Sequence, residues 1–257
     1  MEPLWDFEYQ QIRAFARKVL SSLAGQLPET QKLIVTVHGT GYGLDEDEAF
    51  ESQLAGFLDA VESSDSPDQL DVIIFVERNK GRARRLQETL NQIVPSGTLD
   101  QRGGSRLLDA AKPETRERLR AVGYASASKA HVFVAMPFSD NLEDVYHYGI
   151  RNAAKSAGLL CERADLSSFT GDVITWVRER IRTASLVIAD LSGANPNVYL
   201  EVGFAWGCGI PTILLAQDSS ELRFDVQGQR CLMYKQIRDL EEKLSMELKG
   251  LNSKHGD

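Results

Sequence analysis

The side chains best suited to chemistry gather around one strand and the helix after it, in the second half of the chain. Asp190 closes an apolar run that is typical of a buried strand. Asn195 is a favourable N-cap and Pro196 suits the first helical position, so the free N–H groups of this helix should face the same crevice as Asp190. Glu201 follows Asn197 by four residues, which places both side chains on one helix face. Together these groups could form a site for a polar ligand.

Glu201 is a carboxyl group on an otherwise apolar helix. Its apolar neighbours in the sequence are Val198, Leu200, Val202, Phe204, Ala205 and Trp206. Burying a single carboxylate is costly, so either an arginine or a lysine pairs with it, with Arg163 and Arg230 as candidates, or it lines a polar cavity. A buried ion pair is the simpler interpretation of Glu201 alone. The coincidence of Asp190, the helix N-terminus and Glu201 at one strand end favours a site.

The elements that must position these groups alternate between strand and helix. Apolar runs predict strands at His131–Ala135, Leu159–Glu162, Leu186–Ala189, Thr212–Ala216 and Cys231–Tyr234. Helical patterns lie between them, at about 143–157, 172–183 and 196–206. Because these strands are apolar throughout, we expect an α/β fold of the flavodoxin-like or Rossmannoid type, a parallel sheet with helices on both faces. Such sheets bind ligands outside the carboxyl ends of their strands.

The first half predicts a smaller α/β domain of order α-β-α-β-α. Its elements are expected at about 7–24, 33–38, 46–61, 71–76 and 81–93. We therefore divide the chain into an N-terminal α/β domain (1–110) with a sensor or dimerisation role, a linker (111–129), the nucleotide-site domain (130–235) and a C-terminal helix and tail (236–257). The glycine-rich stretch His38–Gly43 reads as a tight turn or a ligand-sensing loop, and the acidic run Asp45–Glu48 as a helix start.

Bulk properties exclude several classes of partner. The net charge of −8 argues against binding the backbone of a nucleic-acid polymer, which needs clustered basic residues. No apolar run approaches the ~20 residues that span a bilayer, and the acidic N-terminus does not suit a signal peptide, so we expect a cytoplasmic protein without membrane contact. The four histidines show no metal-ligand spacing, so no metal site is expected.

Several motifs of the second half resemble one known group of proteins. They are Val132–Phe138, Arg163–Asp165, Ile188–Ser192, Asn195–Gly203 and Phe224–Arg230. Together they resemble the nucleoside 2-deoxyribosyltransferase-like superfamily, which borders the Toll/interleukin-receptor-like (TIR-like) nucleotide-binding domains of bacteria. The string Asn-Pro-Asn-Val-Tyr-Leu-Glu-Val-Gly is the strongest element. The chain departs from typical transferases in its N-terminal addition and in Ser192-Gly193-Ala194.

This resemblance implies cleavage of an N-glycosidic bond, with Glu201 as the carboxylate that attacks the anomeric carbon. It implies that Asp190 and Asn197 hold sugar hydroxyls or the leaving base. The loop Met136-Pro137-Phe138 would cover the base. Further candidate ligand contacts are Asn195, Tyr199 and Asp165. No cofactor is implied, because NAD or a related nucleotide would be the substrate.

Three functions follow as hypotheses. The first is an N-glycosidase acting on NAD or a related nucleotide, because the TIR-like domains that this chain resembles use a glutamate to split nicotinamide from NAD, often as effectors in bacterial anti-phage defence. An added α/β domain suits a sensor joined to such an effector. The second is nucleoside 2-deoxyribosyl transfer or nucleotide N-hydrolysis in nucleotide metabolism. The third is a non-catalytic nucleotide-sensing module. A homo-oligomer is expected, since related sites are often completed by a neighbouring subunit.

Overall fold

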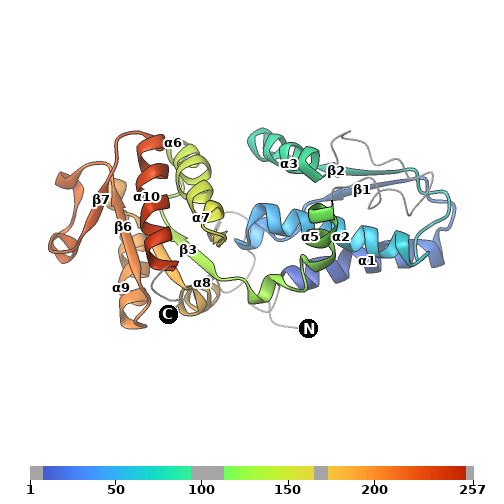
Figure 1. The fold of residues 1–257 in the computed structure, drawn as a ribbon, viewed down its shortest axis with the longest axis horizontal. Coiled ribbons are helices and arrows are strands. Elements are labelled where there is room, and N and C mark those ends of the chain that lie inside the picture. Colours follow the sequence, from blue (N-terminus) through green and yellow to red (C-terminus); the bar gives the residue numbers. More distant parts are fainter. Residues whose placement is uncertain (1–7, 94–112, 165–172, 253–257) are drawn as a thin grey trace. The chain divides into compact units, whose positions relative to one another are not determined.

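The computed structural model describes residues 8–93, 113–164 and 173–252, and the chain divides into two compact units (Figure 1). The first unit comprises Met1–Ser128 and the second comprises Lys129–Asp257. Both units combine helices with a parallel sheet, as the sequence predicts. No helix within the described ranges is long and apolar enough to cross a bilayer.

The first unit is built on two parallel strands with helices against one face. Its elements are α1 (Tyr9–Gln26), β1 (Lys32–Thr36), α2 (Glu46–Glu62), β2 (Val72–Val76), α3 (Lys80–Ile93) and α5 (Pro113–Ala121). The strands pair in register with Ile34 opposite Ile74. The side chains alternate, so one sheet face packs against Leu20 and Phe57 of the helices while the other is exposed. The predicted β-α-β order is confirmed, with a sheet of only two strands.

The segment 111–129, expected as a linker, contributes to the core of the first unit. Arg13 of α1 donates hydrogen bonds from Nη1 to the carbonyl oxygens of Leu119, Arg120 and Val122. The same guanidinium pairs with Asp59 of α2 at 2.7 Å. Because a buried arginine needs all these acceptors, α5 and the turn after it are held against α1 and α2. The first unit therefore extends to Ser128.

The acidic run Asp45–Glu48 starts α2, as predicted, and is also buried. Asp45 accepts hydrogen bonds from the backbone N–H groups of Asp47 and Glu48. The next carboxyls point in different directions, and each has its own partner. Glu46 pairs with Arg85, Asp47 accepts from Thr89 Oγ1, and Glu48 accepts from Ser126 Oγ.

The second unit contains a five-stranded parallel sheet of order β4-β3-β5-β6-β7. Its strands are β3 (His131–Ala135), β4 (Leu160–Glu162), β5 (Leu186–Asp190), β6 (Thr212–Ala216) and β7 (Cys231–Met233). Numbered within the unit, this order is 2-1-3-4-5, which is the flavodoxin-like arrangement. The predicted parallel sheet is confirmed, and its strand order reverses between β3 and β5.

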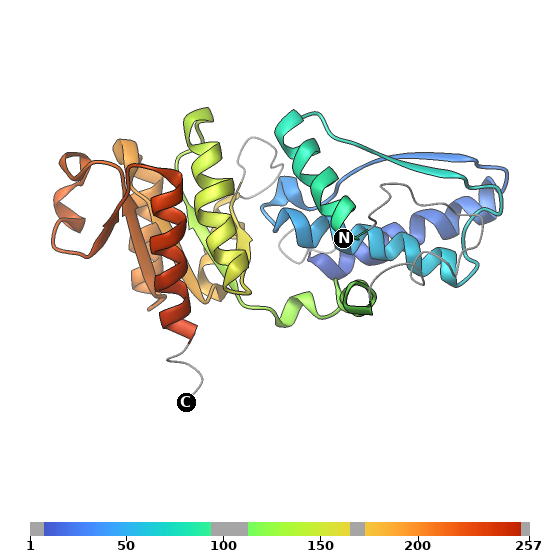
Figure 2. The same ribbon diagram turned by 45° about the horizontal axis from the view of Figure 1, so that its top comes forward.

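Helices cover both faces of this sheet (Figures 1 and 2). One layer contains α6 (Asp140–Asp144), the π-helical segment η4 (Val145–Arg151), α7 (Asn152–Ser156) and α10 (Ile237–Asn252). The other contains α8 (Val173–Thr183) and α9 (Pro196–Gly207). The helix expected at 143–157 thus contains a π-helical turn, a feature that is frequent at functional sites. The sequence predicts α10 as part of a C-terminal segment outside the nucleotide-site domain. In the structure α10 buries Leu240, Leu244 and Leu248 in the core of the second unit.

Candidate functional site

The reversal of strand order brings two predicted loops to one edge of the sheet. Strands β3 and β5 are neighbours, with Ala135 opposite Ala189. The chain leaves β3 toward β4 on one side and leaves β5 toward β6 on the other, and parallel α/β sheets commonly bind ligands at such a switch point. The loop Met136–Phe138 follows β3, and Asp190 ends β5. Phe138 is 43 % exposed beside the buried Met136, so the first loop presents an aromatic ring to solvent, and its contact with a ligand stays a prediction.

Asp190 is fully buried and both of its carboxyl oxygens are bonded within the protein. Oδ1 accepts a hydrogen bond from the backbone N–H of Ser192 at 3.0 Å, and Oδ2 accepts one from the hydroxyl of Tyr234. Burial raises the pKa of Asp190, and the bonds from Ser192 and Tyr234 oppose that rise. Asp190 therefore fixes the loop after β5 to the end of β7. Its direct contact with a ligand stays a prediction.

Tyr234 and Gln217 complete this network, and the sequence analysis did not identify either. Gln217 donates from Nε2 to the Tyr234 hydroxyl at 3.2 Å, and from its backbone N–H to Ser192 Oγ at 3.1 Å. They follow β7 and β6, and each residue directly after a parallel strand is a candidate ligand contact. The signal available in the sequence was that each of these two residues directly follows an apolar run typical of a buried strand.

The loop between β5 and α9 has an unusual backbone. Gly193 and Ala194 both have positive φ, 73° and 49°, and the latter is costly for a residue with a side chain. Two groups outside the loop hold this conformation. Glu221 accepts a hydrogen bond from the Gly193 N–H at 2.8 Å, and Arg223 donates to the Ala194 carbonyl at 3.3 Å. Ser192-Gly193-Ala194, where the chain differs from typical transferases, thus forms a turn that hydrogen bonds with Glu221 and Arg223 hold in place.

Helix α9 begins as predicted. The Asn195 side chain accepts a hydrogen bond from the N–H of Asn197 at 2.9 Å, and Pro196 occupies the first turn. The amide oxygen of Asn195 is therefore committed to capping. Asn197 is exposed, while the Tyr199 hydroxyl accepts from the backbone N–H of Arg223 at 3.2 Å. Among these predicted contacts, the Asn197 side chain is the one that faces solvent freely.

Glu201 lies further along α9 and is half-buried. Of the two alternatives for Glu201, the ion pair with Arg163 or Arg230 does not form, because these arginines bond to Glu143 and Glu247 instead. No described residue forms a hydrogen bond or an ion pair with the Glu201 carboxyl. Burial raises its pKa from 4.5 to about 7. At neutral pH this group is populated in both protonation states, as suits a nucleophile or a general acid.

A second cluster lies where β3 and β4 end, beside the Met136–Phe138 loop. The Arg163 guanidinium stacks at 3.9 Å from the ring centre of Tyr146 and at 4.9 Å from that of Phe138. It also pairs with Glu143 at 2.8 Å. A hydrogen bond from His147, together with Arg163, lowers the pKa of Glu143 to about 2. Arg163 thus ties this loop to the π-helical layer, and sequence reasoning missed this role.

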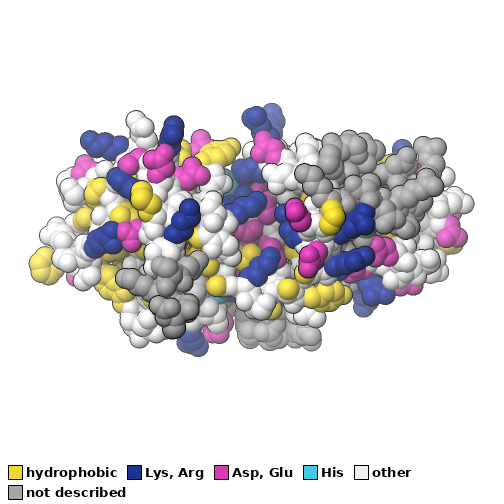
Figure 3. All heavy atoms as spheres, viewed as in Figure 1, with side chains coloured by type: hydrophobic (Ala, Val, Ile, Leu, Met, Phe, Trp, Pro, Cys, Tyr) yellow, Lys and Arg dark blue, Asp and Glu magenta, His cyan; other side chains and the backbone are white. Residues whose placement is uncertain are grey.

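The remaining predictions have mixed outcomes. Asp165 lies outside the described residues. The interpretation of His38–Gly43 as a tight turn gains support, because Gly39 has φ 92° and a Cβ there would lie 2.5 Å from Ile12 Cδ1. Within the described ranges, no group of three or more His, Cys, Asp or Glu side chains is arranged to hold a metal ion. On the face shown in Figure 3, basic and acidic side chains of the described residues are interspersed.

No protein-family model matches the chain, and no curated protein matches it significantly. The resemblance to deoxyribosyltransferase-like and TIR-like domains therefore stays a prediction. The features that bear on function are the strand order, the Asp190 network and Glu201.

Proposed function

We propose that the second unit is an N-glycosidase that cleaves the base–sugar bond of NAD or a related nucleotide, with Glu201 as the catalytic carboxylate. The observation that carries this proposal is a half-buried carboxyl with no partner among the described residues and a pKa of about 7. It sits on the helix that follows the reversal of strand order, where ligands of parallel α/β sheets bind. An unpaired, desolvated carboxyl is costly to keep unless it has a chemical use.

The chemistry needs few groups. A Glu201 oxygen attacks the anomeric carbon as the bond to the base nitrogen breaks, and the bonding electrons leave with the base. The nicotinamide nitrogen of NAD is positively charged, so nicotinamide departs neutral and needs no proton. Water then attacks the anomeric carbon of the glycosyl ester, the bond from this carbon to the Glu201 oxygen breaks to release the carboxylate, and the proton of the water passes to bulk solvent. Because the attacking form is ionised, turnover should rise with pH through about 7, the pKa of Glu201.

Other residues would hold the substrate. The Met136-Pro137-Phe138 loop covers the base, and the Arg163 guanidinium, which lies over the Phe138 ring, holds that ring in place. Asn197 lies on the same face of α9 as Glu201 and offers its exposed amide to a sugar hydroxyl. Asp190 acts through the loop it fixes. In this proposal the protein works as a homo-oligomeric effector of anti-phage defence, with the first unit as its sensor.

The test is release of free base by the purified full chain. We expect nicotinamide from NAD, and no release by the Glu201→Gln variant. Glu241→Gln on α10 is the matched control, because it makes the same change at another half-buried helical position. A panel of nucleosides and nucleotides, with and without added free base, separates hydrolysis from transfer: acceleration by free base indicates a deoxyribosyltransferase. Equal turnover by wild type and Glu201→Gln would refute the assignment. A nucleotide recovered bound and intact would favour a sensing module.

A further inference from the structure

A cavity of about 680 Å³ opens at the carboxyl ends of β6 and β7, and none of its lining residues has a role in the proposed reaction. Gln217 and Asp218 line it from the end of β6. Met233, Tyr234 and Lys235 line it from the end of β7. Small-molecule sites commonly measure ~300–1,000 Å³, so this volume exceeds what a single inorganic ion needs.

Most charged groups of the cavity are already paired within the protein. Lys243 bonds to the Met233 carbonyl at 2.8 Å and to Asp239 at 2.9 Å. Asp218 accepts a hydrogen bond from the backbone N–H of Ser220 at 2.8 Å, which lowers the pKa of its carboxyl. These bonds neutralise one lysine and keep Asp218 ionised as an acceptor.

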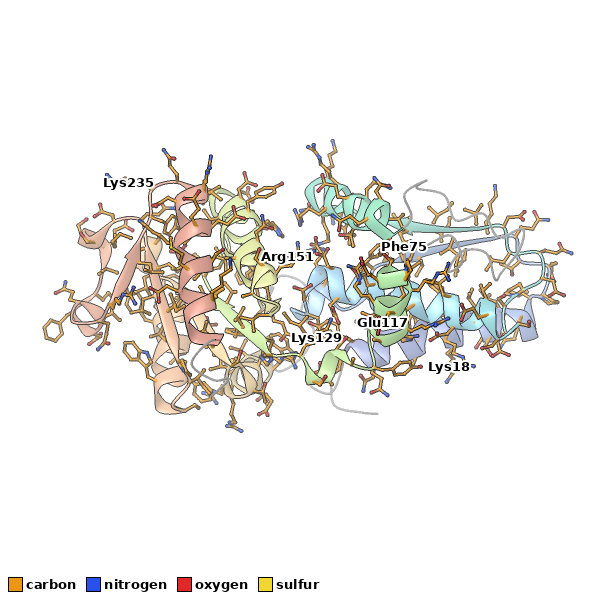
Figure 4. All side chains as sticks on the ribbon, in the orientation of Figure 1. Lys18, Phe75, Glu117, Lys129, Arg151 and Lys235 are labelled. Atoms are coloured by element: carbon orange, nitrogen blue, oxygen red, sulfur yellow. The ribbon has the colours of Figure 1, made fainter. Side chains whose placement is uncertain are left out.

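Lys235 is the second lysine of this lining, and unlike Lys243 it forms no ion pair among the described residues. It is exposed and forms no ion pair within 4.0 Å among the described residues, although its charge contributes to lowering the pKa of Asp218. Figure 4 shows its side chain projecting from the surface of the second unit. The first turn of α10, which begins at Ile237 directly after the lining residue Gln236, adds the positive end of a helix to the same rim. Lys235 and this rim favour an anionic group on the ligand.

Two lining residues of the cavity are bonded to the loop after β5. Tyr234 lines the cavity and donates its hydroxyl to the buried Asp190. Gln217 lines it as well, and bonds to both Tyr234 and Ser192. A ligand seated here would contact the two residues that hold Asp190 and its loop in place.

We propose that this cavity binds a small phosphate monoester that carries hydroxyl groups, of about the size of a nucleoside monophosphate. The phosphate lies at Lys235, because this is the unpaired cation of the lining. A sugar hydroxyl donates to the ionised Asp218, and the base lies over Met233. This site does not depend on the chemistry of Glu201.

The four methionines of the chain allow the site to be located directly. Met233 lines the cavity, Met136 lies in the loop after β3, and Met246 is an exposed residue of α10. The full chain, carrying Glu201→Gln to prevent turnover, is labelled with ¹³C at its methionine methyl groups and titrated with AMP, adenosine or inorganic phosphate. AMP should shift the Met233 signal saturably at millimolar concentration and leave Met246 unchanged. Adenosine, without the phosphate, should bind about tenfold more weakly.

Two exposed lysines provide the matched variants. Lys235→Gln should weaken AMP binding about tenfold, because it removes a charge-assisted contact to the phosphate. Lys249→Gln, near the other end of α10, should leave the affinity unchanged. An unmoved Met233 signal, or equal weakening by both variants, would overturn the proposal. A shift of Met136 alone would place AMP at the strand-order reversal, which refutes the cavity site and leaves the glycosidase proposal standing.

Discussion

Replacing Glu201 by glutamine should stabilise the second unit at alkaline pH, even though it removes the proposed catalytic group. Burial raises the pKa of Glu201 from 4.5 to about 7, so the folded chain keeps a proton that the unfolded chain has lost. The free energy of unfolding of the wild type therefore falls as the pH rises from about 4.5 to about 7, and this contribution stays constant above that range. Glutamine is neutral throughout and avoids this loss.

The size of the effect follows from the pKa shift. One pKa unit is worth ~1.36 kcal/mol, so the rise from 4.5 to about 7 sets an upper bound of ~3 kcal/mol. Glu201 is half-buried, and water at the exposed part of the carboxyl lowers the cost of its charge. We therefore expect Glu201→Gln to gain about 1–2 kcal/mol over the wild type above pH ~8, and almost nothing near pH ~4.5.

Urea unfolding at both pH values measures this difference. Of the three tryptophans, Trp176 and Trp206 lie in the second unit, so their fluorescence follows its transition. Glu241→Gln is again the control, because any general effect of removing one negative charge from this unit appears there too. A difference between Glu201→Gln and the wild type that is equal at the two pH values would refute the reasoning, because it would show that the Glu201 carboxyl is not desolvated.

Three further substitutions test the packing around the site and in the first unit. Tyr234→Phe keeps the ring but removes the donor to the buried Asp190, and should cost ~1–3 kcal/mol in urea unfolding; unchanged stability would contradict the bond. Gly56→Ala should cost at least ~2 kcal/mol in thermal unfolding of the first unit, because its Cβ would lie 2.1 Å from a backbone oxygen of α1, whereas Gly25→Ala has open space and should be tolerated. Arg163→Lys keeps the charge but loses the planar stack on two aromatic rings, and should cost ~1 kcal/mol by urea unfolding; full retention of stability would argue against that stack.

The amino-acid sequence determined the features that depend on local patterns. Runs of apolar residues located the strands of the second unit, because buried parallel strands need apolar side chains on both faces. Asn195 and Pro196 located the start of α9, because capping involves groups only two residues apart. The same local reasoning placed Glu201 on that helix and Asp190 at the end of β5.

The tertiary structure alone decided which distant groups meet. Tyr234 bonds to Asp190 across 44 positions of sequence, and Arg13 reaches carbonyl groups more than 100 positions away. Arg163 pairs with Glu143 rather than with Glu201, so the latter carboxyl is left unpaired among the described residues. The physical reason is that hydrogen bonds and ion pairs need contact within a few ångströms, and for residues this far apart that contact is set by strand order and helix packing, which periodicity does not encode.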